Sequence, residues 1–527
     1  MCGIIAIIGP NAVTQIAKLP DLLNHRGPDG QGIYADHHGV LYHNRLAIVD
    51  LPTGRQPLGA GQTRLIHNGE IYNHELLRRE KLNLCDFQTQ SDSEVILHLY
   101  RQYGAQATLQ WLDGIFSFVI LDGDNFMAAR DPIGVKPLYY GEDRAGNQVF
   151  ASEIKAIAAF CPTFKEFPAG HYFTPQQGLQ RYFDAQDFNP SSSTGPDVDH
   201  QLRQLLTHAV DKQLMADVPV GCLLSGGLDS SLIAAIIRQL RPQETLYTFS
   251  VGIHADAPDL KAARQVAAHI GSEHHEVIFD LNQVKKDLKQ ILWRLESYDL
   301  ANVRSGIPLY YLCQAIAEKG IKVVLSGEGA DEIFGGYLFF NDAPSDSAFH
   351  QELINKLNGL ATIDCLRVDR MSMAHGVEVR VPFLDRDVIR WAMTLAPAFK
   401  RPHNNPKNIE KYILRKAFDY LEYTYLPESI LWRQKEQFSD GVGYSWREQF
   451  VALCEAQALG NLTEGTANPN AVNPPATQEA RWIRQLFDQL FPWQSAAECV
   501  TCWRPAWQNS TDPSARKTTH HLKPLSQ

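Results

Sequence analysis

A short stretch in the middle of the chain combines a glycine turn with side chains that could bind phosphate. The apolar run Val220–Leu224 predicts a buried strand, and Ser225-Gly-Gly227 follows it directly. Asp229, Ser230 and Ser231 then open a segment whose apolar residues predict a helix. Two glycines let the backbone turn sharply and approach a ligand closely. Because the free N–H groups and the positive dipole end of a helix start attract anions, the stretch predicts an anion site.

Several features of this loop narrow the kind of anion that it could bind. A Walker A loop is excluded because its lysine is absent and its glycine spacing differs, and the chain has no G-x-G-x-x-G motif. An ordinary strand-to-helix turn with a capping side chain would use similar residue types. The run Ser-Gly-Gly-Leu-Asp-Ser, however, resembles the pyrophosphate loop of the ATP pyrophosphatase family, whose members cut ATP between its α and β phosphates. This resemblance favours phosphate binding over the ordinary turn.

A second loop, later in the chain, repeats the design of the first. Residues Lys322–Leu325 predict a strand, which runs into Ser326-Gly-Glu-Gly-Ala-Asp-Glu332 and then into Phe334-Gly-Gly-Tyr337. In open α/β sheets, ligands bind beyond the carboxyl ends of the strands. We therefore expect both glycine-rich loops to line one cleft.

The N-terminus offers a different chemistry, which depends on Cys2. Removal of Met1 would leave a thiol and a free α-amino group on this one residue. That amine has an ordinary pKa of about 7.7–8.0 and can act as a base at neutral pH, and a thiol beside its own base is an activated nucleophile. A lone cysteine at this position would normally be accidental. The segments that favour a functional role are, in chain order, Met1-Cys-Gly-Ile4, His25-Arg-Gly-Pro-Asp-Gly30, Arg45-Leu-Ala-Ile-Val-Asp50, Asn68-Gly-Glu-Ile-Tyr-Asn73, Ser91-Asp-Ser-Glu94 and Arg130-Asp-Pro-Ile-Gly-Val-Lys136.

These segments resemble the class II glutamine amidotransferase domain, an N-terminal-nucleophile hydrolase. The resemblance implies that Cys2 attacks the side-chain amide of glutamine and releases ammonia. It also implies that Asn68 and Gly69 form the oxyanion hole, where two donors meet the developing negative charge.

The same resemblance assigns residues to the rest of the glutamine pocket. Arg45 would hold the α-carboxylate, which suits a planar bidentate donor, and Asp92 would hold the α-ammonium. Glu70 and Asn73 would shape the pocket. Asp92 could also serve as a negative charge at the start of a helix, and the two roles are compatible.

The chain as a whole resembles the asparagine synthetases of the glutamine-hydrolysing type. The similarity covers nearly the whole length, and Ala330, where many members carry serine, is a small departure. The segment between Arg238 and Thr245 is short, which predicts a trimmed surface loop. In the second part of the chain the matching segments are Ser225–Ser231, Phe249–Gly252, Ser297–Asp299 with Arg304, Val324–Tyr337, Val377–Asp385 and Trp432–Gly441, and the tail Asp512–Arg516 resembles that of some members.

This second resemblance implies a reaction in two steps. The β-carboxylate of aspartate is a poor electrophile, so ATP adenylates it and pyrophosphate leaves. Ammonia then attacks the β-aspartyl-AMP and gives asparagine and AMP. Asp229 and Asp331 would bind Mg²⁺, which neutralises the phosphates. The residues expected around ATP are Leu224, Ser225, Gly226, Gly227, Asp229, Ser230, Ser231, Val251, Ser326 and Gly327.

Three further residues receive catalytic roles from the same resemblance. Glu328 would act near the acyl-adenylate, as a base or a positioning group. Arg304 and Lys435 would offset the charge of the phosphates. Lys435 and Glu436 by themselves would be an ordinary solvated charge pair, and only the surrounding match at Trp432–Gly441 favours a role in the site.

The spacing of apolar residues indicates the elements that must position these side chains. Residues 2 to about 183 hold short strand-like runs separated by glycine-bearing turns. After a predicted helix at His200–Met215, strands and helices alternate, as in a parallel α/β sheet, and beyond about residue 350 the pattern is mainly helical. The expected strands are Ile4–Ile8, Val40–Tyr42, Leu65–His67, Ile115–Leu121, Val149–Ala151, Val220–Leu224, Leu246–Val251, His275–Phe279 and Lys322–Leu325, and further expected helices are Asp92–Tyr103, Leu260–Ile270 and Ile307–Glu318.

We therefore predict two domains joined by a linker. Residues 1–183 would form an α+β domain, for which the resemblance implies the αββα layers of the N-terminal-nucleophile hydrolases. Residues 184–199 are polar and turn-rich, as in a linker. Residues 200–527 would form an α/β parallel-sheet domain of the ATP pyrophosphatase type with a mainly helical C-terminal part.

The composition argues against several classes of protein. A hydrophobic content of 44% and a charged content of 20% are those of an ordinary globular protein. The net charge of −10 and the pI near 6.0 argue against general binding to nucleic acid or to a membrane surface. No apolar run approaches the ~20 residues of a membrane span, and Gly3–Gly9 lacks the preceding basic residues of a signal peptide.

Cysteine usage and the resemblance together suggest where the protein works and in what form. The nine cysteines are scattered, which favours reduced thiols in the cytoplasm. Cys499 and Cys502 form a lone pair without the second pair that a zinc site needs. The resemblance implies a homodimer that acts on small molecules.

Two other functions remain open from the residues alone. A β-lactam-forming or natural-product amidotransferase would use the same ATP loop on another carboxylate, although the lactam-forming enzymes typically lack the cysteine nucleophile. A glutamine- or ATP-sensing protein without activity would be expected to lose Cys2, Asp229 or Lys435, and all three are present. The choice of aspartate as acceptor comes from the resemblance.

Overall fold

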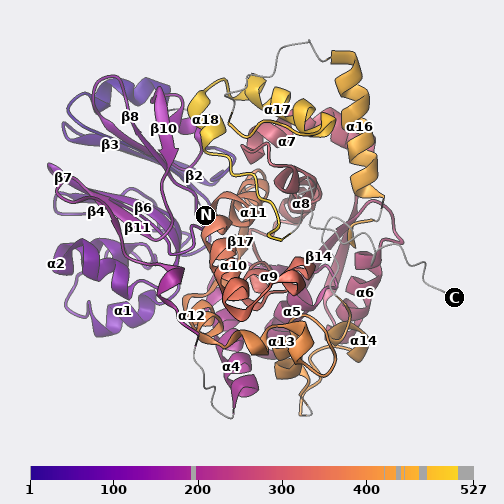
Figure 1. The fold of residues 1–527 in the computed structure, drawn as a ribbon. Helices are drawn as coiled ribbons and strands as arrows, with labels where there is room; N and C mark the ends of the chain where they lie inside the picture. The colour runs from indigo at the N-terminus through magenta and orange to yellow at the C-terminus, as the bar shows by residue number, and fades with distance from the viewer. Residues whose placement is uncertain are drawn as a thin grey trace.

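The structure is a computed structural model, which describes residues 2–19, 21–190, 197–420, 422–434, 441–443, 445–461 and 472–507. Three β-sheets organise these residues, two from the first part of the chain and one from the second part (Figure 1). All strand pairs in the first two sheets are antiparallel. All pairs in the third sheet are parallel. The expected change from antiparallel to parallel pairing along the chain is confirmed.

The two antiparallel sheets pack face to face. Side chains of β1 (Gly3–Ile8) alternate between its two faces, as in any strand. Ile4 and Ala6 share a core with Val119 of the opposite sheet, whereas Ile5 and Ile7 belong to a core that includes residues of short helices on the outer side. Helices α1 (His74–Glu80) and α2 (Glu94–Trp111) cover the outer face of the other sheet. This layering confirms the αββα arrangement.

The antiparallel strands agree with the apolar runs in the sequence, with small differences at their ends. The first sheet has the order β10-β8-β9-β1-β3-β2 and the second the order β12-β11-β7-β6-β5-β4. The remaining strands are β2 (Gly30–Ala35), β3 (Gly39–Arg45), β4 (Leu58–Ala60), β5 (Thr63–Ile71), β6 (Gly114–Asp122), β7 (Asn125–Arg130), β8 (Tyr139–Glu142), β9 (Gln148–Ala151), β10 (Thr163–Glu166), β11 (His171–Thr174) and β12 (Gly178–Arg181).

The parallel sheet has the order β15-β14-β13-β16-β17. Four of its strands match predicted runs: β13 (Val220–Leu223), β14 (Tyr247–Gly252), β15 (Glu273–Ile278) and β16 (Val323–Leu325). The fifth, β17 (Glu378–Arg380), was not predicted, because two of its three residues are charged. These two side chains are fully buried and bonded to each other, Arg380 Nε to Glu378 Oε1 at 2.6 Å.

Helices connect and cover the parallel strands, and they dominate the chain beyond residue 350, as expected. The helix α2 continues eight residues beyond the predicted end at Tyr103, across a non-helical Gly104. The other helices are α3 (Ile154–Ile157), α4 (Val198–Gln213), α5 (Leu228–Leu240), α6 (Pro258–Ile270), α7 (Leu281–Leu295), α8 (Leu300–Glu318), α9 (Ala330–Phe334), α10 (Asp346–Gly359), α11 (Asp364–Met373), α12 (Arg386–Thr394), α13 (Tyr412–Phe418), α14 (Glu428–Leu431), α16 (Trp446–Asn461), α17 (Gln478–Leu490) and α18 (Gln494–Glu498).

Buried ion pairs join the two parts of the chain. Arg26, which is fully buried, donates to both carboxylate oxygens of Asp369 on α11 (2.8 and 3.0 Å) and to Glu153 (2.9 Å). The next residue of α11, Arg370, lies 3.5 Å from the same Glu153. Nearer the C-terminus, α18 packs against β10 (Figure 1). Ser495 Oγ of α18 accepts a hydrogen bond from the main-chain N–H of Phe164 on β10.

Among the described helices, none combines the length and the apolar character needed to cross a membrane.

Candidate active sites

Cys2 directly precedes β1 and is buried, with 7% of its surface exposed. Its main-chain N–H donates to Asn68 Oδ1 (2.9 Å), and its carbonyl accepts from Arg26 Nε (3.0 Å). Burial raises the pKa of the Cys2 thiol, while the positive charge of the chain terminus and the N–H of Leu46 act in the opposite direction. Once Met1 is removed, the nitrogen that Asn68 holds is the α-amino group, so Asn68 would orient the expected base.

Asn68 and Gly69 are consecutive residues of β5, and they meet different neighbours. Gly69 lies against the paired strand β6, with φ at 144°, and a Cβ added to it would lie 1.9 Å from the carbonyl oxygen of Ile115. Only glycine fits this position without displacing β6. The strand pairing therefore fixes the glycine of the expected oxyanion hole, and the contact with Cys2 fixes the asparagine.

Arg45 and Asp92 are both buried, and each is held by main-chain groups. Arg45, the last residue of β3, donates to the carbonyl groups of the loop 49–51 (2.6 to 3.3 Å). Asp92 Oδ2 accepts from the N–H of Ile71 (2.8 Å) just before α2 begins. Burial raises the pKa of Asp92 because it removes water from the carboxylate, so a nearby cation would stabilise the ionised form. This is the chemistry that an α-ammonium group would supply.

Glu70 and Asn73 have positions that bear on the pocket in different ways. Asn73 fixes the turn after α2, because its Nδ2 donates to the carbonyl of Trp111 (2.8 Å) and its Oδ1 accepts from the N–H of Asp113 (3.1 Å). Glu70 lies 3.5 Å from Arg380 of β17, at the contact between the two parts of the chain. Burial and the neighbouring Glu378 raise the pKa of Glu70.

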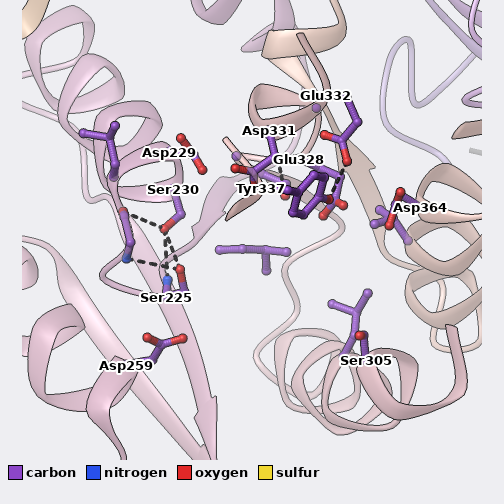
Figure 2. Close-up of a pocket in the computed structure, with 18 of the residues that line it drawn as sticks. Ser225, Asp229, Ser230, Asp259, Ser305, Glu328, Asp331, Glu332, Tyr337 and Asp364 are labelled. Carbon is purple, nitrogen blue, oxygen red and sulfur yellow. Dashed lines mark hydrogen bonds between the residues drawn. The ribbon is translucent and has the colours of Figure 1, made fainter. Parts of the chain in front are cut away.

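A cavity of about 260 Å³ lies beyond the carboxyl ends of the parallel strands. Both glycine-rich loops line it, as expected, and Figure 2 shows Ser225, Asp229 and Ser230 on one side facing Glu328 and Asp331 on the other. The predicted residues that line it are Leu224, Ser225, Gly227, Asp229, Ser230, Val251, Arg304, Ser326, Gly327, Glu328 and Asp331.

The first loop is fixed by its own hydroxyl groups. Ser230 Oγ accepts from the N–H of Ser225 (3.1 Å), and the two hydroxyls lie 3.0 Å apart. The second loop then packs directly on the first, because a Cβ on Gly327 would lie 2.5 Å from the nitrogen of Ser230. Glycine at position 327 is therefore what allows the two loops to close around one cavity.

Two of the residues expected around ATP do not line the cavity. Gly226 makes the turn, with φ at 72°, and a Cβ there would lie 2.5 Å from that of Ala262. Ser231 is fully buried on α5, one residue beyond Ser230, which lines the cavity. Gly226 thus shapes the loop through its backbone, and Ser231 points into the protein interior.

The two expected metal ligands share one cation. Lys411 Nζ lies 2.6 Å from Asp229 Oδ2 and 2.6 Å from Asp331 Oδ1, and its side chain is 1% exposed. Two carboxylates that both reach one point suit a divalent cation, which prefers oxygen ligands. Asp229 Oδ1 is buried and makes no hydrogen bond within the part of the chain that the structure describes. The donor set therefore fits Mg²⁺.

The opposite wall carries acidic groups paired with cations. Arg367 of α11 contacts Glu328 (2.7 Å) and Asp364 (2.8 Å). Glu332 accepts from the hydroxyl of Tyr337 (2.5 Å), as Figure 2 shows. Burial, reinforced by nearby carboxylates such as Asp364, raises the pKa of Glu332 to about 8.

Arg304 and Lys435 are the two expected phosphate partners. Arg304 lines the cavity, and its guanidinium is bound to Glu479 of α17 through two contacts (2.9 and 2.5 Å). Lys435 lies outside the described residues. Its neighbour Arg433 also lines the cavity and donates to the carbonyl of Gly226 (3.2 Å).

The cavity contains charged residues that sequence reasoning missed. Lys411 ends the run Lys407-Asn-Ile-Glu-Lys411, which has mixed charge and no glycine and matches no motif. Arg367 and Asp364 lie on α11 and belong to none of the motifs identified in the sequence. Only Glu332 and Arg433 lie inside segments that carry the family resemblance, Val324–Tyr337 and Trp432–Gly441. The missed cavity residues of this kind are Asp259, Glu332, Lys356, Asp364, Arg367, Glu410, Lys411, Arg415 and Arg433.

Family models match both parts of the chain. The model described as a glutamine amidotransferase domain matches residues 1–198. The model described as asparagine synthase matches residues 201–347 and 341–510.

Curated relatives match over nearly the full length. An asparagine synthetase [glutamine-hydrolyzing] of Zea mays is 42% identical, over 99% of this chain and 94% of its own length. A probable asparagine synthetase [glutamine-hydrolyzing] of Dictyostelium discoideum is 42% identical, over 99% of each chain. Asparagine synthetase B [glutamine-hydrolyzing] of Escherichia coli strain K12 is 41% identical, also over 99% of each chain.

Proposed function

The chain belongs to the glutamine-hydrolysing asparagine synthetase family, and from this membership we propose how its residues divide the reaction between two sites. The protein converts L-aspartate to L-asparagine with ATP and with ammonia from glutamine. It releases glutamate, AMP and pyrophosphate. Glutamine hydrolysis is the task of the first part of the chain, and amidation is the task of the second.

In the first site, Cys2 attacks the glutamine amide after removal of Met1. Its α-amino group, held by Asn68, takes the thiol proton, and Asn68 and Gly69 stabilise the oxyanion. Arg45 and Asp92 bind the α-carboxylate and the α-ammonium of glutamine. The burial of both side chains supports this assignment, because a buried carboxylate needs a partner of opposite charge.

In the second site, the glycine-rich loops bind the phosphates of ATP. Ser225, Gly227 and Ser230 cradle the pyrophosphate, and Leu224, Val251 and Gly327 border the nucleoside. Asp229 and Asp331 would hold Mg²⁺, which would neutralise the charge of the phosphates. Glu328 lies on the same loop as Asp331 and faces Asp229 across the cavity, and we assign it the role of a base or positioning group for the acyl-adenylate. Arg304 and Lys435 offset phosphate charge.

Residues 1–183 form the glutaminase unit, 184–199 the linker and 200–527 the synthetase unit in this proposal. Support comes from the strand order, since the antiparallel sheets end with β12 at Arg181 and α4 begins at Val198. We also propose that the protein is cytoplasmic, in keeping with nine free cysteines, and that it works as a homodimer.

The main support for two separate sites is that the two groups of residues lie in different parts of the structure. Cys2 lies in the αββα layers, whereas both glycine-rich loops close one cavity beyond the parallel sheet. The test is Cys2→Ala, assayed with glutamine and, separately, with ammonia. Glutamine-dependent synthesis should fall by about four orders of magnitude or more, while ammonia-dependent synthesis persists.

A second variant tests the role of the α-amino group. If Met1 is retained, the thiol stays but the amine becomes part of a peptide bond, and glutamine use should again be lost while ammonia use remains. If the folded Cys2→Ala variant still made asparagine from glutamine, the assignment of Cys2 as the nucleophile would be wrong. A panel of carboxylates, with pyrophosphate release as the readout, tests aspartate against the acceptors of natural-product amidotransferases.

A further inference from the structure

We propose that Lys411 is an exchangeable counter-ion: it neutralises Asp229 and Asp331 in the empty site, and it moves to the nucleotide phosphates when a divalent cation takes its place. The inference rests on the proposed metal role of the two aspartates. It goes further by assigning a task to a residue outside both glycine-rich loops.

The geometry shows that the ammonium group occupies the point where the two loops converge. Lys411 Nζ is 2.6 Å from one oxygen of each aspartate. The aspartates come from the start of α5 and from α9, so the lysine is a third segment that closes the gap between them. Without the lysine, two largely buried carboxylates would face each other at one point of the cavity wall. Two like charges so close together repel each other, which would destabilise the folded protein.

The path of the lysine stem is closely fitted. A Cβ on Gly336 would lie 2.4 Å from Lys411 Cε and 2.0 Å from Asp331 Oδ1, so the stem passes over a glycine that has no room for a side chain. Glycine at this position lets the lysine reach both carboxylates.

The backbone at Lys411 is also specifically held. Its φ of 53° lies in the left-handed region, which costs a non-glycine residue roughly 1–2 kcal/mol. The preceding residue is fixed by Arg415, whose Nε donates to the carbonyl of Glu410 (2.9 Å) and whose Nη2 contacts its carboxylate (2.5 Å). A strained residue that is held in place at a cavity wall indicates a functional constraint.

A lysine in this position and a divalent cation exclude each other. Mg²⁺ binds oxygen ligands at about 2.0–2.1 Å, so a cation shared by the two carboxylates would occupy the space of the ammonium. A metal shared by these two oxygens can therefore enter only when Lys411 leaves. The phosphates that arrive with the metal are the natural destination, because a lysine is a mobile point charge that binds phosphate oxygens.

The first experiment measures metal binding without nucleotide. Mn²⁺ serves as the probe, and free Mn²⁺ is followed by electron paramagnetic resonance in wild type and Lys411→Met. Removing the competing ammonium should increase the affinity for Mn²⁺ by about tenfold or more. The double variant Lys411→Met with Asp331→Asn should lose this gain. Lys411→Gln, which keeps a donor without the charge, provides the same test if the methionine variant folds poorly.

The second experiment measures ATP binding in the presence of a chelator that removes divalent cations. Here Lys411→Met should bind ATP about tenfold more weakly, because the cation for the phosphates is lost. The matched control is Lys212→Met, since Lys212 bridges Asp113 and Asp385 in the same way (2.6 and 2.5 Å) outside the cavity. Its affinity for ATP should be that of wild type.

The two opposite changes distinguish an exchangeable counter-ion from a structural lysine. Unchanged or weaker Mn²⁺ binding by a folded Lys411 variant overturns the proposal, and so does unchanged ATP binding without metal. Both measurements concern binding alone, so they stand even if the acceptor carboxylate proves to be something other than aspartate.

Discussion

Glu332 shows how the surroundings of one residue can make the stability of the folded protein depend on pH. It is almost completely buried, its carboxylate oxygen accepts from Tyr337, and burial, with a contribution from Asp364, raises its pKa from 4.5 to about 8. The folded protein therefore keeps a proton on Glu332 at neutral pH that the unfolded chain has released. For a carboxyl group with a raised pKa, this contribution to stability declines as the pH rises from about 5 to 8.

The variant Glu332→Gln tests this behaviour, because an amide resembles the protonated carboxyl and cannot ionise. We expect the stability of the variant relative to wild type to increase from about pH 5 to pH 8 and to level off above that. Thermal denaturation at a series of pH values provides the measurement. A difference that stays constant across this range would show that Glu332 is ionised in the folded protein.

Lys411 shows why some residues of the site could not be predicted from the sequence. The glycine loops carry local motifs, so Ser225, Asp229 and Asp331 could be proposed from a few neighbouring residues. Lys411 has no local signal, since it meets Asp229 only after the chain has folded across many intervening residues. Arg367 was missed for the same reason, because its partner Glu328 lies in another element.

At the scale of elements, the apolar strands could be predicted and the charged strand could not. Hydrophobic runs revealed β1, β13 and β14, because buried strands are apolar on both faces. The strand β17 is just as buried but contains Glu378 and Arg380, which neutralise each other. A pattern based on hydrophobicity cannot detect a strand whose charges are paired inside the protein.

The contact between the two glycine-rich loops gives a prediction about elements. Adding a methyl group at position 327 would place it 2.5 Å from the nitrogen of Ser230, so Gly327→Ala must push the loops apart. We expect affinity for ATP to fall by about tenfold or more, while the glutaminase activity at Cys2 remains. Isothermal titration with ATP and a separate glutaminase assay would measure the two effects.

Gly359→Ala is a matched control for this variant. Position 359 lies at the end of α10, and the nearest atom to an added Cβ is 3.5 Å away, an ordinary contact distance. This variant should bind ATP as wild type does. Equal ATP affinity in the two variants would mean that the loops do not need to touch.

At the scale of the whole molecule, charges buried between the two parts of the chain hold them together. Arg26 binds the carbonyl of Cys2 and, at the same time, the carboxylate of Asp369 on α11. The same helix carries Arg367, which contacts Glu328 in the other site. One ten-residue helix therefore contacts groups beside both proposed sites.

Asp369→Ala tests what this arrangement contributes. The change removes two hydrogen bonds from a guanidinium that is fully buried, and losing one partner of a buried ion pair typically costs about 3–5 kcal/mol. Because the lost bonds join the two parts of the chain, calorimetry should show a lower midpoint and unfolding that separates into two transitions. Glutamine-dependent synthesis should fall more than ammonia-dependent synthesis, since Arg26 also holds the Cys2 carbonyl.

The control is Asp346→Ala, which breaks a contact to Arg401 from an exposed aspartate and should cost about 1 kcal/mol or less. If both variants unfolded at the same temperature, the Arg26–Asp369 pair would be no more than an ordinary surface contact, and the two parts would be held together by their apolar interface alone.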